Sequence, residues 1–572
     1  MTKHVTILDG SGTPLPDATR KSAQMQARQN LMMSSAAYRG GNYSHPATSN
    51  WHSSRLSGHA ALSMDREKLN ERIRDMTRND SHVASGIDRK INNVVGDGFR
   101  LSVQLDGRLL NLTSDEIETI SGQIEALWKV YATETGLHAD AERQGTVADL
   151  VLLASRDLET AGEAFGNLVW RDNPSPCGFQ TAMQCIHPAR CSNPSNRQDN
   201  AYLRDGVQLD DFSAPIGYWF RRSHPGEIAS LGNDRYVWDY FERNHECGRP
   251  RICHVKERME AGMYRGVSKL VSVMTKQRQG ENYMDYETQA AMLNAVMALF
   301  IETPFDQFEL MDAVTPESVT SQHQVNQAIH KENPLEMQGA QVNILAPGER
   351  PHQLKADHPN TAFEPFMKNI LRACASVLGI TYEQLTGDWS DVNYSSARAA
   401  ILEAAKGFRV VANRLKTHFL GPWYRAWLEE AFDKGYIDIP DHAPSFDDAP
   451  DAWSAADWIG AGKGYVDPMK EVQAAGLRIA LGLSTWEKEC AEQGEDYREM
   501  IAQVVREIKS TRQELVKAGL PPDLIQHPAM KGVPSSSLLA KSFPSDDEET
   551  PKKKSRSGVP YVRRSTGELA NA

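Results

Sequence analysis

The sequence predicts a mixed α+β fold that is predominantly helical. Apolar residues recur at helical spacing through most of the chain, and the clearest stripe covers residues 363–378. Between residues 164 and 260 this pattern is replaced by short strand-like runs, which clusters of Pro, Asn and Gly separate. The chain has 572 residues, of which 40% are hydrophobic and 24% charged, so about four structural units can fold around apolar cores.

The overall charge argues against tight binding of nucleic acid. The chain carries 63 Lys and Arg residues against 75 Asp and Glu residues, a formal net charge of −12. Such a chain is a poor candidate for salt-sensitive wrapping of DNA, because that binding scales with contacts from Lys and Arg to phosphates. The same charge is compatible with DNA that slides past, since a sliding surface should not grip phosphates.

Cysteine usage and hydropathy restrict the cellular location. The seven cysteines form no CxxC pair, and an odd, scattered set indicates a reducing cytoplasm rather than a disulfide framework. The N-terminus lacks the apolar stretch and small-residue cleavage site of a signal peptide. No run of about 18 apolar residues occurs, so no membrane span is expected.

In the N-terminal half we expect a weakly ordered arm over residues 1–60, which are rich in Ser, Asn, Gly and Ala. Residues 64–95 have helical spacing, and Asp80 with Ser81 offers a second helix start within them. The other elements expected before residue 260 are a strand at 99–105, helices at 114–135 and 146–160, and strands at 165–170, 179–186, 217–221 and 251–255.

Two helices are expected on either side of an irregular insertion. The first covers residues 284–301, and the second, at 363–378, ends at Gly379 in the manner of a glycine C-cap. Six prolines punctuate residues 304–360 between them. The polar loop that follows the second helix lies at 385–394.

A long helix is expected at 396–434, with Ser395 as its N-cap. Gly421 and Pro422 should bend or break it. Its apolar stripe is narrow, which is typical of a helix packed between neighbours, so we expect no single large core. The chain then continues through a connector at 440–468, a helical region at 468–519 and a disordered charged tail from residue 521.

Several residue groups suggest chemistry, and for each we favour a structural role. His245, Cys247, Cys253 and His254 are possible metal ligands, but a zinc site needs four ligands at tighter spacing. Cys374 is a possible nucleophile, but it lies in the apolar stripe of its helix and reads better as a buried thiol. We therefore predict no catalytic residue, no metal site and no cofactor.

Two charged segments remain open to more than one interpretation. Asp388 and Asp391 are near enough for paired-carboxylate chemistry, but a solvated acidic loop is the simpler interpretation. The basic run at 552–556 can touch DNA or RNA through its charge, or it can be a solvated end.

An ordered set of motifs resembles the lambda-type portal proteins of tailed phages. The run from Leu378 to Arg398 resembles that family's L-G-(I/V)-x-Y-x-x-L-(T/S)-G-D-x-S-x-x-N-Y-S-S-x-R block almost position for position. Order and spacing agree over roughly residues 65–515, although each weaker motif is unspecific alone. The weaker motifs are NNVVGDGFRL at 92–101, LAPGE at 345–349, DPMKE at 467–471, GLST at 482–485 and GED at 494–496. One departure is His187-Pro-Ala-Arg190, where the family often has D-A-D-R, so no role is assigned there.

The resemblance implies a portal fold with wing, stem, clip and crown, assembled as a ring of about twelve copies at one capsid vertex. Mapped onto this chain, the regions are an arm at 1–60, the wing at 61–280, stem helices at 281–303 and 361–384, the clip at 304–360, a channel-facing tunnel loop at 385–394, a long wing helix at 395–440, the crown at 441–520 and a disordered tail at 521–572.

The resemblance also implies site residues. The tunnel loop comprises Gly387, Asp388, Trp389, Ser390, Asp391, Val392, Asn393 and Tyr394, and the long helix starts with Ser395, Ser396 and Arg398. If Asp388 and Asp391 face the channel, they repel phosphates and DNA passes without long-lived contacts. Trp389 either acts as a wedge against the duplex or packs against the long helix. For Arg398, Lys406 and Arg409 we favour pairing between subunits over contact with DNA.

The implied partners are those of a capsid vertex, and no membrane is among them. They are further copies of the chain, the terminase large subunit that supplies packaging energy, the major capsid protein, head–tail connector proteins, and viral double-stranded DNA passing through the channel. The implied location is the virion, after assembly in the host cytoplasm. Two alternatives remain: a head adaptor or scaffold that contacts no DNA, and a hydrolase that uses Cys374 or the two aspartates.

Overall fold

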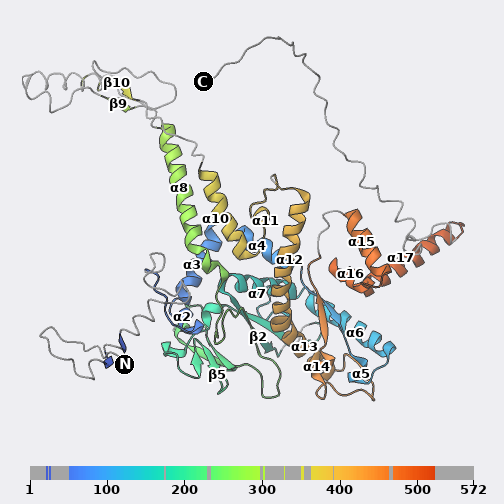
Figure 1. The fold of residues 1–572 in the computed structure, drawn as a ribbon. Helices are drawn as coiled ribbons and strands as arrows, with labels where there is room; N and C mark the ends of the chain where they lie inside the picture. The colour runs from blue at the N-terminus through green and yellow to red at the C-terminus, as the bar shows by residue number, and fades with distance from the viewer. Residues whose placement is uncertain are drawn as a thin grey trace, which may run out of the picture.

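The computed structural model describes residues 50–172, 176–227, 234–296, 300–302, 350–352, 362–390, 392–462 and 468–521, together with residues 21, 22, 25, 26, 328 and 331. The expected arm at 1–60, insertion at 304–360 and tail from 521 lie largely outside these residues. Within them the fold is mixed α+β and predominantly helical, as predicted (Figure 1).

The N-terminal helices begin where the sequence offers caps. The Asp80 carboxylate accepts hydrogen bonds from the backbone N–H groups of His82 (2.8 Å) and Val83 (3.1 Å), which separates two helices as predicted. Two later helices start with capping boxes, from Thr113 and Thr146. The elements of this part are α2 (Gly58–Ser63), α3 (Arg66–Asn79), α4 (Ser81–Val94), β1 (Arg100–Val103), α5 (Gly107–Leu110), α6 (Ser114–Ala132) and α7 (Val147–Ala161).

Two antiparallel sheets occupy the predicted strand-rich region. The first has the order β3-β2-β8, and the second has the order β4-β5-β6-β7. Their strands are β2 (Glu163–Trp170), β3 (Thr181–Ile186), β4 (Leu203–Arg204), β5 (Val207–Leu209), β6 (Pro215–Arg221), β7 (Trp238–Glu242) and β8 (Ile252–Lys256). The sequence prediction missed β4 and β5, which are too short for a visible alternation, and β7, whose five residues include none that is fully buried.

A helical hairpin projects from the body (Figure 1). It consists of α8 (Met274–Val296) and α10 (Phe363–Leu378), and at its tip β9 (Phe300–Glu302) pairs antiparallel with β10 (Arg350–His352). The rings of Tyr283 and Phe366 meet edge to face with centroids 4.9 Å apart, and a Cβ at Gly280 would lie 3.1 Å from Ile370. The predicted bounds of the first helix, 281–303 for the stem and 284–301 for the apolar stripe, are wrong at both ends. The helix begins earlier, at Met274, and Phe300–Glu302 forms a strand. Its contact face begins before the predicted stripe, and Met292 of that stripe is exposed.

The long helix passes through Gly421 and Pro422 without breaking. It runs as α12 (Tyr394–Leu415), one π-helical turn (Lys416–Leu420) and α13 (Gly421–Asp433). Pro422 has no N–H to donate to the preceding turn, and the wider π turn directly before it accommodates the change in hydrogen bonding. The expected break is therefore replaced by a local widening of the helix.

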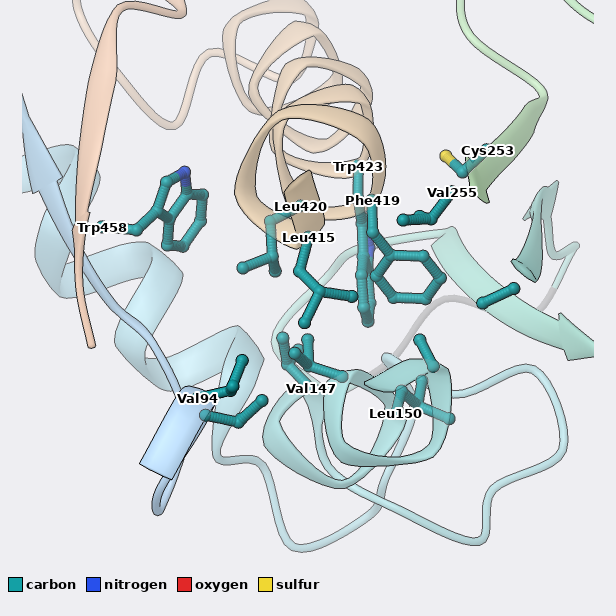
Figure 2. Close-up of a cluster of buried hydrophobic side chains, with 14 of the residues drawn as sticks. Val94, Val147, Leu150, Cys253, Val255, Leu415, Phe419, Leu420, Trp423 and Trp458 are labelled. Carbon is teal, nitrogen blue, oxygen red and sulfur yellow. The ribbon is translucent and has the colours of Figure 1, made fainter. Parts of the chain in front are cut away.

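The second half of this long helix is buried in a large hydrophobic core, so the expectation of no single large core is wrong. Figure 2 shows Leu415, Phe419 and Trp423 pointing at Val147 and Leu150 of α7. Trp423 and Trp427 are fully buried, and the Trp427 ring lies 5.0 Å from that of Trp128 on α6. Four aromatic or aliphatic residues at intervals of four along the helix make a wide apolar stripe here, unlike the narrow one at its start.

The connector after this helix belongs to the same body. The strand β11 (Ala456–Ile459) pairs antiparallel with β1, which places Leu101 opposite Trp458. Trp453, at the end of α14 (Pro450–Trp453), is fully buried. Three helices then follow, as predicted for 468–519: α15 (Pro468–Ala480), α16 (Trp486–Glu492) and α17 (Tyr497–Lys517).

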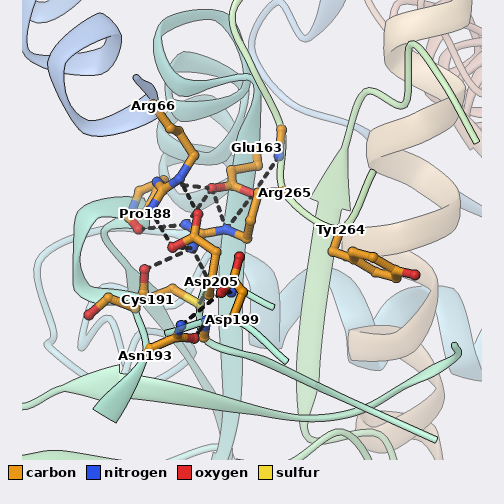
Figure 3. A network of polar contacts seen from close by, with 12 residues as sticks. Arg66, Glu163, Pro188, Cys191, Asn193, Asp199, Asp205, Tyr264 and Arg265 are labelled. Carbon is orange, nitrogen blue, oxygen red and sulfur yellow. Dashed lines mark hydrogen bonds and ion pairs between the residues drawn. The ribbon is translucent and has the colours of Figure 1, made fainter. Parts of the chain in front are cut away.

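A buried polar network joins α3 to both sheets (Figure 3). Arg265 Nη2 donates to Glu163 Oε1 (2.6 Å), and Arg66 Nε donates to Asp205 Oδ2 (2.5 Å). Arg265 also donates to the backbone carbonyl of Cys191 at 2.8 Å. Because both arginines and Glu163 are buried, loss of one partner would leave an uncompensated charge, so the network fixes how these elements pack.

His254 couples this network to pH. Its Nε2 lies 3.2 Å from Glu163 Oε2, and its ring stacks on Phe165 with centroids 4.2 Å apart. Burial and the neighbouring Lys256 lower the pKa of His254 to about 3, against the opposing effect of Glu163. The unfolded chain therefore binds a proton here below about pH 6.5 while the folded chain does not, so stability is lost as the pH falls.

We expect His254→Gln to be less stable than the wild type at about pH 7.5 but to lose less stability on acidification. Between about pH 7.5 and pH 5, the wild type should lose roughly 2 kcal/mol more free energy of unfolding than the variant. Urea unfolding at both pH values measures this difference. His52→Gln, at an exposed position, is the control, and equal pH slopes for the wild type and His254→Gln would contradict the prediction.

Candidate functional site: the loop between α11 and α12

The candidate loop leaves a short helix and enters the long one. The short helix α11 (Tyr382–Thr386) starts with a capping box between Thr381 and Gln384 and ends at Gly387, whose φ of 77° is left-handed. The long helix begins at Tyr394, with Asn393 as its cap: the Asn393 side-chain oxygen accepts from the Ser396 N–H at 2.9 Å. The predicted cap at Ser395 is wrong. The side-chain oxygen of Asn393 caps the helix instead, and Ser395 already lies within its first turn.

The predicted loop start at residue 385 is wrong, because Leu385 is buried in α11, which continues to Thr386. Residues 387–390 and Asn393 are exposed, and Val392 is half-buried. The Asp388 carboxylate accepts from Ser390 through its hydroxyl (2.5 Å) and its N–H (3.1 Å), and these bonds lower the pKa of Asp388, so it stays ionised at neutral pH. Trp389 is 43% exposed. Val392 donates from its N–H to the Trp389 carbonyl at 3.4 Å. Asp391 and the side chain of Tyr394 lie outside the described residues, so the proposed carboxylate pair is not tested.

Arg89 of α4 holds the root of this loop, which the sequence analysis did not predict. Its guanidinium donates to the Gln384 carbonyl at the end of α11, and a Cβ at Gly387 would lie 3.2 Å from its Nη2. One turn earlier, Gly86 lets Leu385 approach so closely that a Cβ there would lie 2.7 Å from the Leu385 side chain. The only sequence signal for this contact was the spacing of Gly86 and Arg89, a small residue and an arginine at positions i and i+3 of a helix.

Cations from α10 also lie beside the loop. Lys368 and Arg372 each lie 5.6 Å from the ring of Tyr382 in α11. Lys368 contributes to the lowered pKa of Asp388, after the two bonds from Ser390. The surroundings of the loop are thus of mixed charge, whereas the sequence alone predicted only an acidic loop.

The sequence of the chain, including this loop, is similar to known proteins. A family model described as phage portal protein, lambda family, matches residues 44–411. The portal protein of Escherichia phage N15 is 33% identical over 485 residues, which cover 82% of this chain and 89% of that protein.

The chain belongs to the lambda family of phage portal proteins.

A second relative agrees with this membership. Portal protein B of Escherichia phage lambda is 32% identical over 483 residues, which cover 82% of this chain and 88% of that protein. Among solved structures, the neck of a native gene transfer agent particle matches with a TM-score of 0.34 and 14% identity, over 66% of this chain and 91% of that one. An HK97-family portal protein from Corynebacterium diphtheriae matches with a TM-score of 0.28 and 11% identity, over 60% and 89%.

Family membership fixes the general function. A portal protein is the virion component through which genomic DNA enters and leaves the capsid, and proteins of this family are not generally enzymes. Among the described residues, no group of three or more His, Cys, Asp or Glu side chains lies close enough to hold a metal ion. Over the same residues, no helix has the length and apolarity needed to cross a membrane.

The other candidate residues of this portal protein have structural surroundings. Cys374 is fully buried in the apolar face of α10, and burial raises the pKa of its thiol to about 12, so it remains protonated. Cys253 is likewise buried in β8. Within the chain, Arg398 lies 3.7 Å from Glu471 and Lys406 lies 2.5 Å from Glu403. Pairing of these cations between subunits stays a prediction.

We expect Arg89→Ala to release the loop without unfolding the subunit. A hydrogen bond from a charged donor contributes about 1.5–3 kcal/mol, so the amides of residues 387–393 should exchange hydrogen roughly tenfold faster. Hydrogen exchange followed by mass spectrometry measures this. Arg89→Lys should restore part of the protection because it keeps a donor, and Arg72→Ala, exposed on α3, should change nothing. Unchanged exchange in Arg89→Ala would show that the loop is held elsewhere.

Proposed function

We propose that about twelve copies of this portal protein form a ring around a channel for viral double-stranded DNA. The observation that supports this most is the adjacency of two elements. The hairpin of α8 and α10 projects from the body (Figure 1). The short helix α11 follows α10 and contacts it, and the loop that leaves α11 is exposed at residues 387–390 and 393. A projecting hairpin with a polar loop at its base has the form expected of a channel wall.

The proposed regions follow the packing of the described elements. The wing comprises residues 61–273 and the long helix, and we extend it to residue 462 because β11 pairs with β1. The stem comprises α8 and α10. The clip at 304–360 leaves and returns at the β9–β10 pair, and we start the crown at α15 rather than at residue 441.

In this arrangement Asp388, Trp389 and the residues beside them face the DNA. The ionised Asp388 repels phosphates, while Lys368 and Arg372 nearby limit that repulsion. Because adhesion grows with the number of Lys or Arg contacts to phosphates, this mixture allows passage without a long-lived grip. The exposed face of Trp389 is available to touch the duplex.

The partners we propose are those of a packaging vertex. The terminase large subunit supplies energy and docks at the clip, where head–tail connector proteins bind later, and the major capsid protein surrounds the wing. We propose no catalytic residue and no cofactor: the Cys374 thiol is buried and protonated, which leaves no activated nucleophile there. A head adaptor that contacts no DNA is the alternative function.

The ring itself is the first test. Purified full-length protein should give closed rings of about twelve subunits in electron micrographs and a matching mass by light scattering. A chain that stays monomeric across a range of salt and protein concentrations would refute the ring.

The loop charge is the second test. Asp388→Lys combined with Asp391→Lys should leave rings intact but slow DNA packaging into reconstituted heads, and the effect should weaken as salt screens the charges. Glu403→Lys, an exposed charge reversal on α12, is the matched control. If the variant packages DNA normally at low salt, the loop lies away from the DNA. If the wild-type chain forms intact rings that do not support DNA packaging, the head adaptor is the better function.

A further inference from the structure

A group of basic side chains gathers where α3 meets the segments that follow β3 and β6. We call it the basic cluster. Its members are Arg74 and Arg78 of α3, His187 and Arg190 after β3, and His224 after β6. The segment 187–190 is the one that departs from the family pattern, and the proposed channel makes no use of the cluster.

The members of the basic cluster lie close enough to repel one another. The rings of His187 and His224 meet edge to face with centroids 4.7 Å apart. Burial, and after it the charge of Arg74, lowers the pKa of His187 to about 3. The same two causes lower the pKa of His224. Both rings are therefore neutral at pH 7, because a further positive charge beside Arg74 is unfavourable.

The guanidinium of Arg74 lacks the acceptor that a buried donor normally has. Its Nη2 is buried and makes no hydrogen bond with any residue that the structure describes. Arg66, eight residues earlier on α3, instead donates to Asp205. The hydroxyl of Ser223, directly before His224, is also buried and has no hydrogen-bond partner in the described part of the chain. Because buried polar groups are nearly always hydrogen-bonded, these donors indicate a further partner.

The two histidines each keep one N–H free for such a partner. The Ala189 N–H donates to His187 Nδ1 (3.2 Å), and the Gly226 N–H donates to His224 Nδ1 (3.1 Å). A neutral ring that accepts at Nδ1 carries its proton on Nε2. No hydrogen bond joins either Nε2 to a described residue, so both N–H groups are available as donors.

The acids near the basic cluster form no ion pair with it among the described residues. Burial raises the pKa of Asp157, near Arg74, to about 7, so this carboxyl is only partly ionised at neutral pH. The two oxygens of Asp239, near Arg190, accept from Arg222 at 2.9 and 3.0 Å. Three further acids act on the cluster through charge alone: Glu71 on Arg74, Glu142 on Arg190 and Glu227 on His224.

We propose that the basic cluster binds one phosphate group. Arg74 supplies the planar fork of donors of a guanidinium, and the Nε2 atoms of His187 and His224 supply two more donors from other segments. A phosphate group presents its oxygens tetrahedrally and accepts from several directions, whereas a carboxylate presents two oxygens in one plane. The group belongs either to free inorganic phosphate or to the backbone of DNA, since both offer such oxygens. The inference goes beyond the proposed channel and does not depend on the ring.

Calorimetric titration of the full-length protein with inorganic phosphate tests the site, at an ionic strength held constant with chloride. The wild type should bind phosphate. Arg74→Gln and His224→Gln should each bind it roughly tenfold more weakly, because each loses a charge-assisted hydrogen bond. Arg74→Lys should recover part of the affinity because it keeps a charged donor. Arg72→Gln, which removes an exposed charge from the same helix, is the matched control and should change nothing.

Duplex DNA then identifies the source of the phosphate group. If a short duplex displaces inorganic phosphate from the wild type and binds Arg74→Gln more weakly, the backbone of DNA is the ligand. If the duplex leaves the bound phosphate in place, the ligand is free phosphate.

Two results would overturn the proposal. One is a folded wild-type protein that binds neither inorganic phosphate nor the duplex. The other is equal affinity in the wild type, Arg74→Gln and His224→Gln, because the phosphate would then bind elsewhere. Circular dichroism checks that each variant is folded, and the two variants alter different segments, so a folding defect in one does not decide the outcome.

Discussion

The burial of the second half of the long helix is the constraint on which the rest of the structure depends. Trp423 and Trp427 lie in the core with Trp128, while the first half of the same helix stands largely clear of it. One continuous helix is therefore buried in the core at its C-terminal end and largely exposed at its N-terminal end. Since a continuous helix transmits position along its length, the core also fixes where Asn393 begins the helix and where the candidate loop must end.

The loop is fixed at its other end by a second, smaller set of contacts. Leu385 packs against Gly86, and Arg89 caps the end of α11. The loop is thus held at one end by α4 and at the other by the core, although residues 387–390 and 393 of the loop are exposed. This is the usual arrangement of a functional loop on a rigid support.

Much of the fold could be predicted from the sequence, because it depended on local signals. The stripe of 363–378, the cap at Asp80 and the glycine at 379 each predicted an element that the structure contains. The failures depended on distant partners. Periodicity says nothing about which face of α8 meets Ile370, and nothing local predicts that Trp458 returns to pair beside Leu101. For the site, the loop residues came from a family resemblance, while Arg89 and Lys368 are distant in sequence and required the packing of α4 and α10.

The β9–β10 pair has a consequence for how such a chain can change over time. It brings Phe300 and His352 opposite one another, so the intervening segment starts and ends at nearly one place. The entropy of closing such a segment grows only slowly with its length. Insertions or exchanges there leave the paired helices almost untouched, so this segment can diversify while the supporting architecture is inherited unchanged.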